Sequence, residues 1–155
     1  MAKRFLVPLG CSADGDYVIP FIADAARSAG ATVRLLHVAP VPGNVVGTAG
    51  RTVAYADQEM SRLDTEHTED LRRLEPHLGG IAVETVVRFG EPAEEILREA
   101  DAFGADVIAV MTTCRSGVKR ALLGSVAEQL LRKAAATVLL VRPADGPVPT
   151  TAVSP

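Results

Sequence analysis

Short apolar runs alternate with amphipathic stretches along most of the chain. The apolar runs have the length and the aliphatic or β-branched content of strands, whereas the stretches between them carry apolar residues every three or four positions, as helices do. The pattern predicts strands at residues 5–9, 32–38, 81–89, 105–111 and 137–142. It predicts helices over residues 18–30, 53–74, 92–100 and 126–131, of which 53–74 is long and highly charged.

Strands that are joined by helices need right-handed crossovers, which produce a parallel sheet with helices on both faces. The runs 105–111 and 137–142 are largely apolar, as expected of strands that are buried on both faces. The sequence therefore predicts an α/β fold, a single doubly wound domain over residues 1–143. Residues 144–155 are rich in Pro, Thr and Ser without a core-forming pattern, and they predict a flexible C-terminal tail.

Charge and hydropathy exclude several classes of partner. The chain has 16 Lys and Arg against 19 Asp and Glu, a formal net charge of -3. This balance supplies no positive field for nucleic acid or anionic lipid, so neither is an expected partner. No apolar run approaches the roughly 20 residues that cross a bilayer, and the first residues lack the pattern of a signal peptide. We therefore expect no membrane association and a cytoplasmic location.

Candidate ligand-binding residues follow the first and fourth strands. Ligands of doubly wound sheets bind beyond the carboxyl ends of the strands, where the strand order reverses. Neither common phosphate-binding glycine motif occurs there, but Ser116-Gly117 and Gly124-Ser125 offer backbone N–H groups and hydroxyls. Gly124-Ser125 also opens a helix, whose dipole favours an anion. The alternative is structural: Gly124 would permit close packing, and Ser125 would be an N-cap with Glu128 completing a capping box.

Residues 110–128 strongly resemble the signature region of the universal stress protein family. Further blocks that look like this family follow in the right order: Phe5-Leu6-Val7-Pro8-Leu9, Leu35-Leu36-His37-Val38, Gly90-Glu91-Pro92-Ala93, Gly104-Ala105-Asp106-Val107 and Val138-Leu139-Leu140-Val141-Arg142. The resemblance covers residues 4–142. It implies a five-stranded sheet in the order 3-2-1-4-5, homodimers and, in one branch, ATP bound by Gly-x2-Gly-x9-Gly-[Ser/Thr].

The chain departs from this ATP motif at three positions. Met111 and Cys114 stand at the two leading glycines, and only Gly124-Ser125 is kept. Gly10 stands where ATP-binding members place an acidic residue, while Pro8, Val38 and Val126 match positions that line the nucleotide. The resulting candidate set is Pro8, Gly10, Val38, Met111, Cys114, Ser116, Gly117, Gly124, Ser125 and Val126. A missing charged hydrogen bond, and side chains where glycine would adopt a positive φ, predict weak or absent ATP binding. ATP or AMP binding despite these departures is the alternative.

An enzymatic reading rests on Cys114 and Arg120, which form the C-x5-R spacing of cysteine phosphatases. The resemblance already accounts for Arg120, and Ala121 stands where a Ser or Thr usually follows, so we expect no catalysis. The two cysteines, Cys11 and Cys114, follow neighbouring strands of the implied sheet. They either fill space beside an absent nucleotide or form a reversible thiol pair.

The histidines predict no metal site and no catalytic base. His37 lies within a strand, where a satisfied histidine is the usual case, and His67 lies among Glu66, Glu69 and Asp70 on what the pattern predicts to be a solvated helix face. We therefore expect a non-enzymatic stress-response sensor of a small ligand.

The last strand, from Thr137 to Arg142, is predicted to form a homodimer. Val138 and Leu140 face one side and Leu139 and Val141 the other, so both sides of this edge strand are apolar. Such an edge promotes aggregation unless it is paired or covered. The alternative is that the residues after Pro143 cover it.

Overall fold

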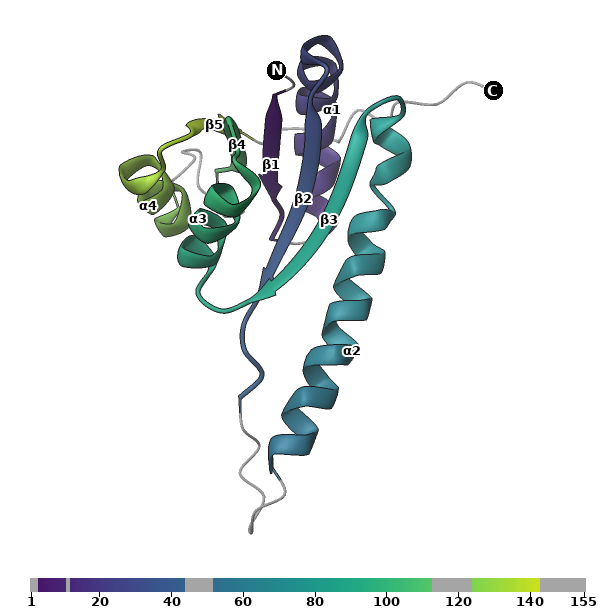
Figure 1. The fold of residues 1–155 in the computed structure, drawn as a ribbon, viewed down its shortest axis with the longest axis vertical. Helices are drawn as coiled ribbons and strands as arrows, with labels where there is room; N and C mark the ends of the chain where they lie inside the picture. The colour runs from purple at the N-terminus through teal and green to yellow at the C-terminus, as the bar shows by residue number, and fades with distance from the viewer. Residues whose placement is uncertain (1–2, 11, 44–51, 113–123, 143–155) are drawn as a thin grey trace, which may run out of the picture.

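The computed structural model describes residues 3–10, 12–43, 52–112 and 124–142 (Figure 1). In chain order the elements are β1 (Arg4–Pro8), α1 (Ser12–Ala29), β2 (Thr32–Ala39), α2 (Thr52–Arg72), the 3-10 helix η1 (Glu75–Leu78), β3 (Ala82–Phe89), α3 (Pro92–Phe103), β4 (Val107–Met111), α4 (Ser125–Lys133) and β5 (Thr137–Val141). All strand pairs are parallel, and the order is β3-β2-β1-β4-β5. The predicted fold and strand order are confirmed.

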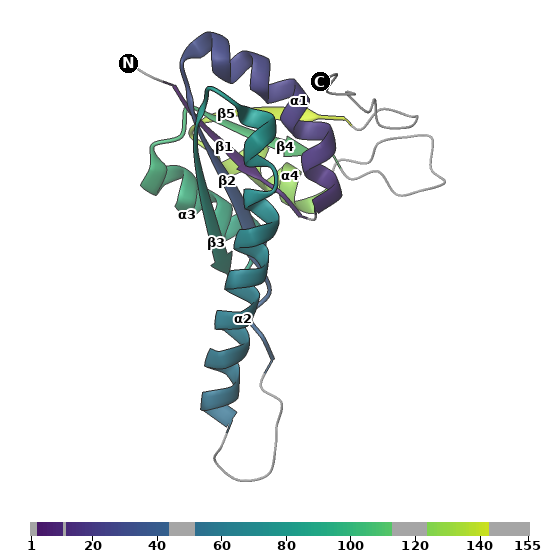
Figure 2. The same ribbon diagram turned by 90° about the vertical axis from the view of Figure 1, so that its right-hand side faces the viewer.

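Helices cover both faces of the sheet, as Figure 2 shows. Alternate strand residues point to opposite faces, so each strand contributes to two cores. Val7 and Leu35 pack in the core beneath α1, α2 and η1, which we call the α1/α2 core. Leu6 and Leu36 pack in the core beneath α3 and α4, which we call the α3/α4 core. All four side chains are fully buried, and each contributes roughly 2 kcal/mol of apolar burial.

The ends of α3 show how local sequence sets an element's limits. Pro92 occupies the first turn, where its missing N–H costs nothing. Gly104 ends the helix with φ 68°, a left-handed conformation that glycine adopts easily, and its N–H donates back to the carbonyls of Ala100 and Asp101. The following residues belong to this cap, since the Ala105 N–H donates to the Ala100 carbonyl. The strand therefore begins at Val107, two residues later than the apolar pattern predicted.

Because the strands are parallel, their carboxyl ends lie at one edge of the sheet, which we call the carboxyl edge. The strands end here at Pro8, Ala39, Phe89, Met111 and Val141. The amino-terminal half of α2 extends past this edge, whereas its last turn packs on the sheet through Leu71 (Figures 1 and 2).

The sequence analysis also made predictions about membrane helices and about the end of the domain. Among the described residues, no helix is both long enough and apolar enough to cross a membrane. The predicted tail, residues 144–155, lies outside the described residues. The domain boundary at residue 143 therefore stays a prediction.

Candidate ligand site at the carboxyl edge

Three of the predicted site residues lie on the same face of the carboxyl edge. Leu6 packs in the α3/α4 core, so Pro8, two residues further along β1, points to the same face. Val38 from β2 and Val126 from α4 are half-buried against this core. Pro8 is the last residue of β1 and Val38 the last but one of β2, and Val126 lies in the first turn of α4; apolar side chains of this kind can contact a planar, apolar part of a ligand.

Thr112, which the sequence analysis did not single out, adds a buried polar group to this face. Its backbone N–H donates to the Val141 carbonyl at 2.9 Å and so continues the sheet beyond β4. Ile108 and Val110 pack in the α3/α4 core, and alternation turns Thr112 the same way. The residue is only 9% exposed, and among the described residues its hydroxyl oxygen has no hydrogen-bond partner. Burying an unpaired hydroxyl costs about 1–3 kcal/mol, so this group is suited to a ligand atom.

The amino terminus of α4 opens at the same edge. Gly124 is its N-cap residue with φ -66° and ψ 157°, and among the described residues no side chain caps it. The predicted capping role of Ser125 was wrong: Ser125 is the first helical residue, and Glu128 accepts a hydrogen bond from Arg132 at 2.7 Å instead of completing a capping box. The close packing proposed for Gly124 stays a prediction. Uncapped first-turn N–H groups and the helix dipole favour a negatively charged ligand group.

Met111 does not obstruct this face. It is the last residue of β4, and its side chain packs against the α1/α2 core on the opposite side of the sheet. The sequence analysis expected a side chain at a glycine position with positive φ to weaken binding, but a strand residue has an extended backbone that any residue adopts. The presence of Met111 in place of glycine should therefore weaken ligand binding much less than the sequence analysis expected.

ATP-binding members of the family carry an acidic residue at the position of Gly10, and in this chain a carboxylate from another residue lies beside Gly10. The Gly10 N–H donates to Asp14 Oδ2 at 2.9 Å, and a Cβ added to Gly10 would lie 3.0 Å from the same oxygen. Asp14, in the first turn of α1, thus occupies the space that a side chain on residue 10 would need. Sequence reasoning missed it because the acid is displaced by four positions and comes from the helix instead of the turn.

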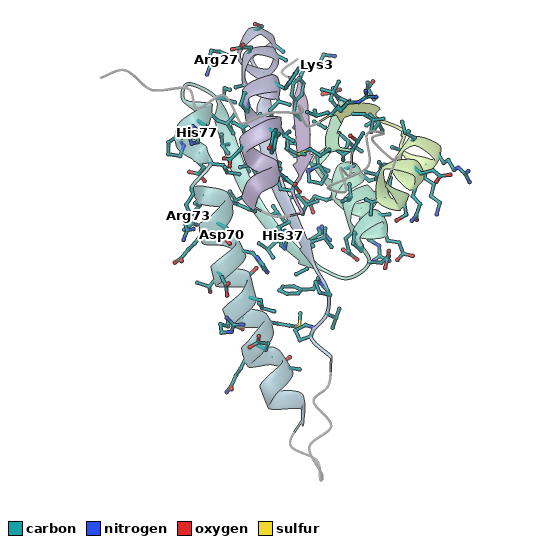
Figure 3. The ribbon with its side chains drawn as sticks, turned by 180° about the vertical axis from the view of Figure 1, so that it is seen from behind. Lys3, Arg27, His37, Asp70, Arg73 and His77 are labelled. Atoms are coloured by element: carbon teal, nitrogen blue, oxygen red, sulfur yellow. The ribbon has the colours of Figure 1, made fainter. Side chains whose placement is uncertain are left out.

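On the opposite face, a cavity of about 250 Å³ lies between the end of β2 and α2. Leu9, Gly10, His37, His67, Asp70, Leu71 and Leu74 line it. The rings of His37 and His67 stack with centroids 4.1 Å apart and planes tilted by 37°. His67 is half-buried, so its predicted place on a solvated helix face was wrong. Figure 3 shows His37 and Asp70 approaching each other from the sheet and from α2.

The remaining predicted residues cannot be placed. Cys114, Ser116 and Gly117 lie outside the described residues, and so do Cys11 and Arg120. The C-x5-R hypothesis and the thiol-pair hypothesis therefore stay predictions. Within the part of the chain that the structure describes, no three His, Cys, Asp or Glu side chains are placed to hold a metal ion.

A wider cavity, of about 600 Å³, lies at the other end of the sheet, at the amino ends of β4 and β5. Asp101, Asp106 and Lys133 are its charged residues. Asp106 is engaged in the fold, because its carboxylate accepts the Arg4 backbone N–H at 2.9 Å. Ligands of parallel sheets bind at the carboxyl ends of the strands, so the smaller features at the carboxyl edge make the better candidate site.

Comparisons with known proteins agree with this architecture. The universal stress protein MJ0577 of Methanocaldococcus jannaschii is 26% identical over an alignment that covers 92% of this chain and 96% of the relative. Its structure superposes with a TM-score of 0.75 at 24% identity and covers 94% of this chain and 99% of that one. This level of identity to a solved structure supports the fold alone.

Other relatives match in part. The universal stress protein MJ0531 of the same organism is 41% identical over 63 residues, which are 41% of this chain and 37% of the relative. A universal stress protein of Methanothermobacter thermautotrophicus is 39% identical over 54% of this chain and 60% of the relative. These two matches therefore span less than two thirds of either relative.

Two solved neighbours are complexes with nucleotides. A universal stress protein from Archaeoglobus fulgidus in complex with dAMP has a TM-score of 0.55 at 22% identity, and the two chains are covered to 91% and 98%. A universal stress protein in complex with cAMP has a TM-score of 0.60 at 17% identity, with 92% and 98% covered. The model of the universal stress protein family matches residues 1–142, and the chain belongs to that family.

Proposed function

We propose that this protein is a non-enzymatic, homodimeric sensor of a small ligand whose anionic group binds at the amino terminus of α4, with adenine nucleotides as weak ligands. The observation that carries the proposal is the buried hydroxyl of Thr112, which has no hydrogen-bond partner within the described part of the chain and lies at the edge where α4 begins. A hydroxyl donor, helix N–H groups that no described side chain caps, and the apolar side chains of Pro8, Val38 and Val126 suit a ligand with one anionic and one planar end. The nucleotide complexes of the two neighbours support adenine nucleotides as the first ligands to test.

Weak nucleotide binding follows from the state of Asp14. Its carboxylate stands at the position of the missing acid, but Oδ2 already accepts the Gly10 N–H. A ligand group that bonds to Asp14 must share or displace this contact. Loss of one charge-assisted hydrogen bond costs roughly 1.5–3 kcal/mol, a factor of about ten to a hundred in affinity.

Calorimetric titration of ATP and AMP, after extraction of bound nucleotide from heat-denatured protein, tests the proposal. We expect dissociation constants well above the micromolar range, and at least a fivefold loss of affinity in Thr112→Val. The matched control is Thr137→Val, the same change at the amino end of β5, which should bind as the wild type does. Micromolar binding by the wild type, or equal binding by Thr112→Val, would contradict the proposal.

A second set of variants tests the displaced carboxylate. Gly10→Asp alone should not raise the affinity, because its Cβ already contacts the Asp14 carboxylate and a second carboxylate would be repelled there. Gly10→Asp combined with Asp14→Ala removes that repulsion and should bind more tightly than either single variant. If Gly10→Asp alone binds most tightly, Asp14 does not occupy the position that we assign to it.

The dimer is proposed through β5, the edge strand beyond β4. Leu139 and Leu140 are 43% and 36% exposed, although they lie on opposite sides of the strand. Pairing of two β5 strands across a twofold axis would hydrogen-bond the backbone groups of this sheet edge and cover both side chains. Light scattering should give twice the chain mass of 16.3 kDa, and Leu140→Lys should lower it. Val41→Lys, the same change at an apolar residue after β2 that is more exposed, is the control. A monomeric wild type at high micromolar concentration would refute the dimer.

The proposed lack of catalysis has its own test. Incubation with an aryl phosphate should release no product that depends on Cys114. Turnover that is lost in Cys114→Ser would establish the phosphatase alternative. The cytoplasmic location predicted from the sequence stays a prediction.

A further inference from the structure

The peptide group between Leu9 and Gly10 is held from both sides. Its carbonyl oxygen lies 2.8 Å from His37 Nδ1, and its N–H donates to Asp14 Oδ2 at 2.9 Å. This peptide directly follows β1 and adjoins Pro8 of the proposed ligand face. Its orientation therefore decides which backbone groups the carboxyl edge presents to a ligand.

The contact with Leu9 fixes the tautomer of His37. A carbonyl oxygen only accepts hydrogen bonds, so Nδ1 carries the proton, and in the neutral ring Nε2 is left as the acceptor. His67, from α2, stacks on this ring with 4.1 Å between centroids. Two neutral imidazoles pack favourably at this spacing, whereas two imidazolium rings repel each other strongly.

The charged groups around the pair come from α1 and α2. Asp14 faces it from α1, and Asp70 from α2, where Asp70 also pairs with Arg73 at 3.1 Å. Burial lowers the pKa of His37; the hydrogen bond with Leu9 opposes this effect, His67 adds to it, and Asp70 and Asp14 oppose it. His37 is therefore neutral at pH 7 and accepts a proton only in more acidic solution than an exposed histidine does.

We propose that His37 is a positioning residue of the ligand edge: its Nδ1–H holds the Leu9–Gly10 peptide, and acidification, by charging His37 against the ring of His67, moves the His37 ring and shifts the peptide that it holds. The ligand edge rests on the proposed function, but the coupling of His37 to Gly10 does not depend on it. The His37 and His67 rings lie on the opposite face of the sheet from the proposed ligand, and through the Leu9–Gly10 peptide they would make ligand binding at the carboxyl edge depend on pH.

Nuclear magnetic resonance of the free protein tests the coupling without any ligand. The chain has three histidines, so each ring can be assigned by substitution. Between pH 7.5 and 5 the Gly10 amide should shift with the same midpoint as His37, below pH 6.5. In His67→Asn the midpoint should change for both groups together, whereas His77→Asn, a matched change in η1, should leave both unaltered. A Gly10 amide that does not follow His37 would overturn the proposal.

ATP titrations at pH 7.5 and 5.5 test the consequence for binding. ATP itself changes its ionisation between these pH values, so the affinity of each variant is compared with that of the wild type at the same pH. We expect the wild type to lose at least fivefold more affinity on acidification than His67→Asn does. His37→Asn, which keeps a side-chain N–H donor, should stay within threefold of the wild type at pH 7.5, whereas His37→Leu should lose about tenfold at both pH values.

Failure of the two proposals can be told apart. If no variant binds ATP but the Gly10 amide follows His37, the nucleotide part of the proposed function fails and the coupling stands. If ATP binds and the wild type and His67→Asn respond equally to pH, the positioning role of His37 is wrong while the ligand site stands. Equal affinities of His37→Leu and the wild type would also refute the positioning role.

Discussion

The two faces of β2 bury polar groups in opposite ways. Towards α3, Arg34 lies between Glu84 and Glu99, and Glu99 also pairs with Arg88. The Arg34 guanidinium stacks on the Phe103 ring, 4.0 Å from its centroid. Towards α2, three residues further along the same strand, the polar group is the His37 ring on His67.

The difference separates groups that hold the fold from groups that can respond. In the α3 cluster, the carboxylates of Glu84, Glu95 and Glu99 are matched by the guanidinium groups of Arg34, Arg88 and Arg98. Burial opposes the charge on Arg34, but its hydrogen bonds to Glu84 and Glu99 hold its pKa above the usual value. Arg34 therefore keeps its charge throughout the physiological range, whereas His37 can change its protonation state at mildly acidic pH.

Breaking the α3 cluster should have the largest effect on stability. Glu99 is 3% exposed, and Glu99→Gln leaves Arg34 and Arg88 without their shared buried charge. We expect a loss of about 3 kcal/mol in the free energy of unfolding, measured by urea denaturation. Glu66→Gln, which removes an exposed partner of Arg62 on α2, should change it by less than about 0.5 kcal/mol. Equal losses in the two variants would contradict the structural role of Glu99.

Titrating the histidine face should have a smaller effect that depends on pH. Because the pKa of His37 is lower in the folded protein than in the unfolded chain, the unfolded chain binds more protons just below pH 6.5. Stability should therefore fall as the pH is lowered from 6.5 to 5.5, by at most about 1.4 kcal/mol per pH unit for this group. Urea denaturation followed by circular dichroism should show the fall in the wild type and in His77→Asn, and a flatter profile in His37→Asn. A wild-type profile as flat as that of His37→Asn would contradict the burial of a neutral ring.

Removing the Thr112 hydroxyl should have the smallest effect, and it should stabilise the free protein. Thr112→Val keeps the shape of the side chain and removes a buried hydroxyl without a partner among the described residues. We expect a gain of about 1 kcal/mol in the free energy of unfolding without ligand. Thr112→Ser, which keeps the hydroxyl, should give no such gain. A loss of stability in Thr112→Val would mean that the hydroxyl has a partner in the folded protein and is not held for a ligand.

The fold could be predicted from the sequence because its signals are local. Apolar runs and helical periodicity predicted all five strands and four α-helices of the described residues, and their alternation required a parallel sheet. The pattern missed η1 and began the first helix at residue 18, whereas α1 begins at Ser12. The strand order came from the resemblance to the family. The pattern misplaced the start of β4, where a helix cap occupies Gly104 to Asp106, because it does not show where the backbone bonds back to the helix.

The site could be predicted only in part because its parts come from distant residues. Pro8, Val38 and Val126 could be named from the resemblance, and their part in ligand binding stays a prediction. The proposed roles of Asp14 and Thr112 depend on where their side chains point. The stack of His37 on His67 joins residues thirty positions apart and has no local signal at all. Alternation from Val110 could have directed Thr112 to the α3/α4 face, had the strand pattern been extended by one residue.

Mapping of ATP contacts on the protein tests the central claim most directly, namely that the ligand binds at the carboxyl edge on the α3/α4 face. Backbone amide resonances would be followed while ATP is added to the wild type up to millimolar concentration. The account predicts the largest shifts at Gly10, Val38, Thr112 and Ser125, and reduced shifts there in Thr112→Val. Shifts centred on Asp101, Lys133 and Thr137, around the cavity at the amino ends of β4 and β5, or no shifts in any part of the protein, would contradict it.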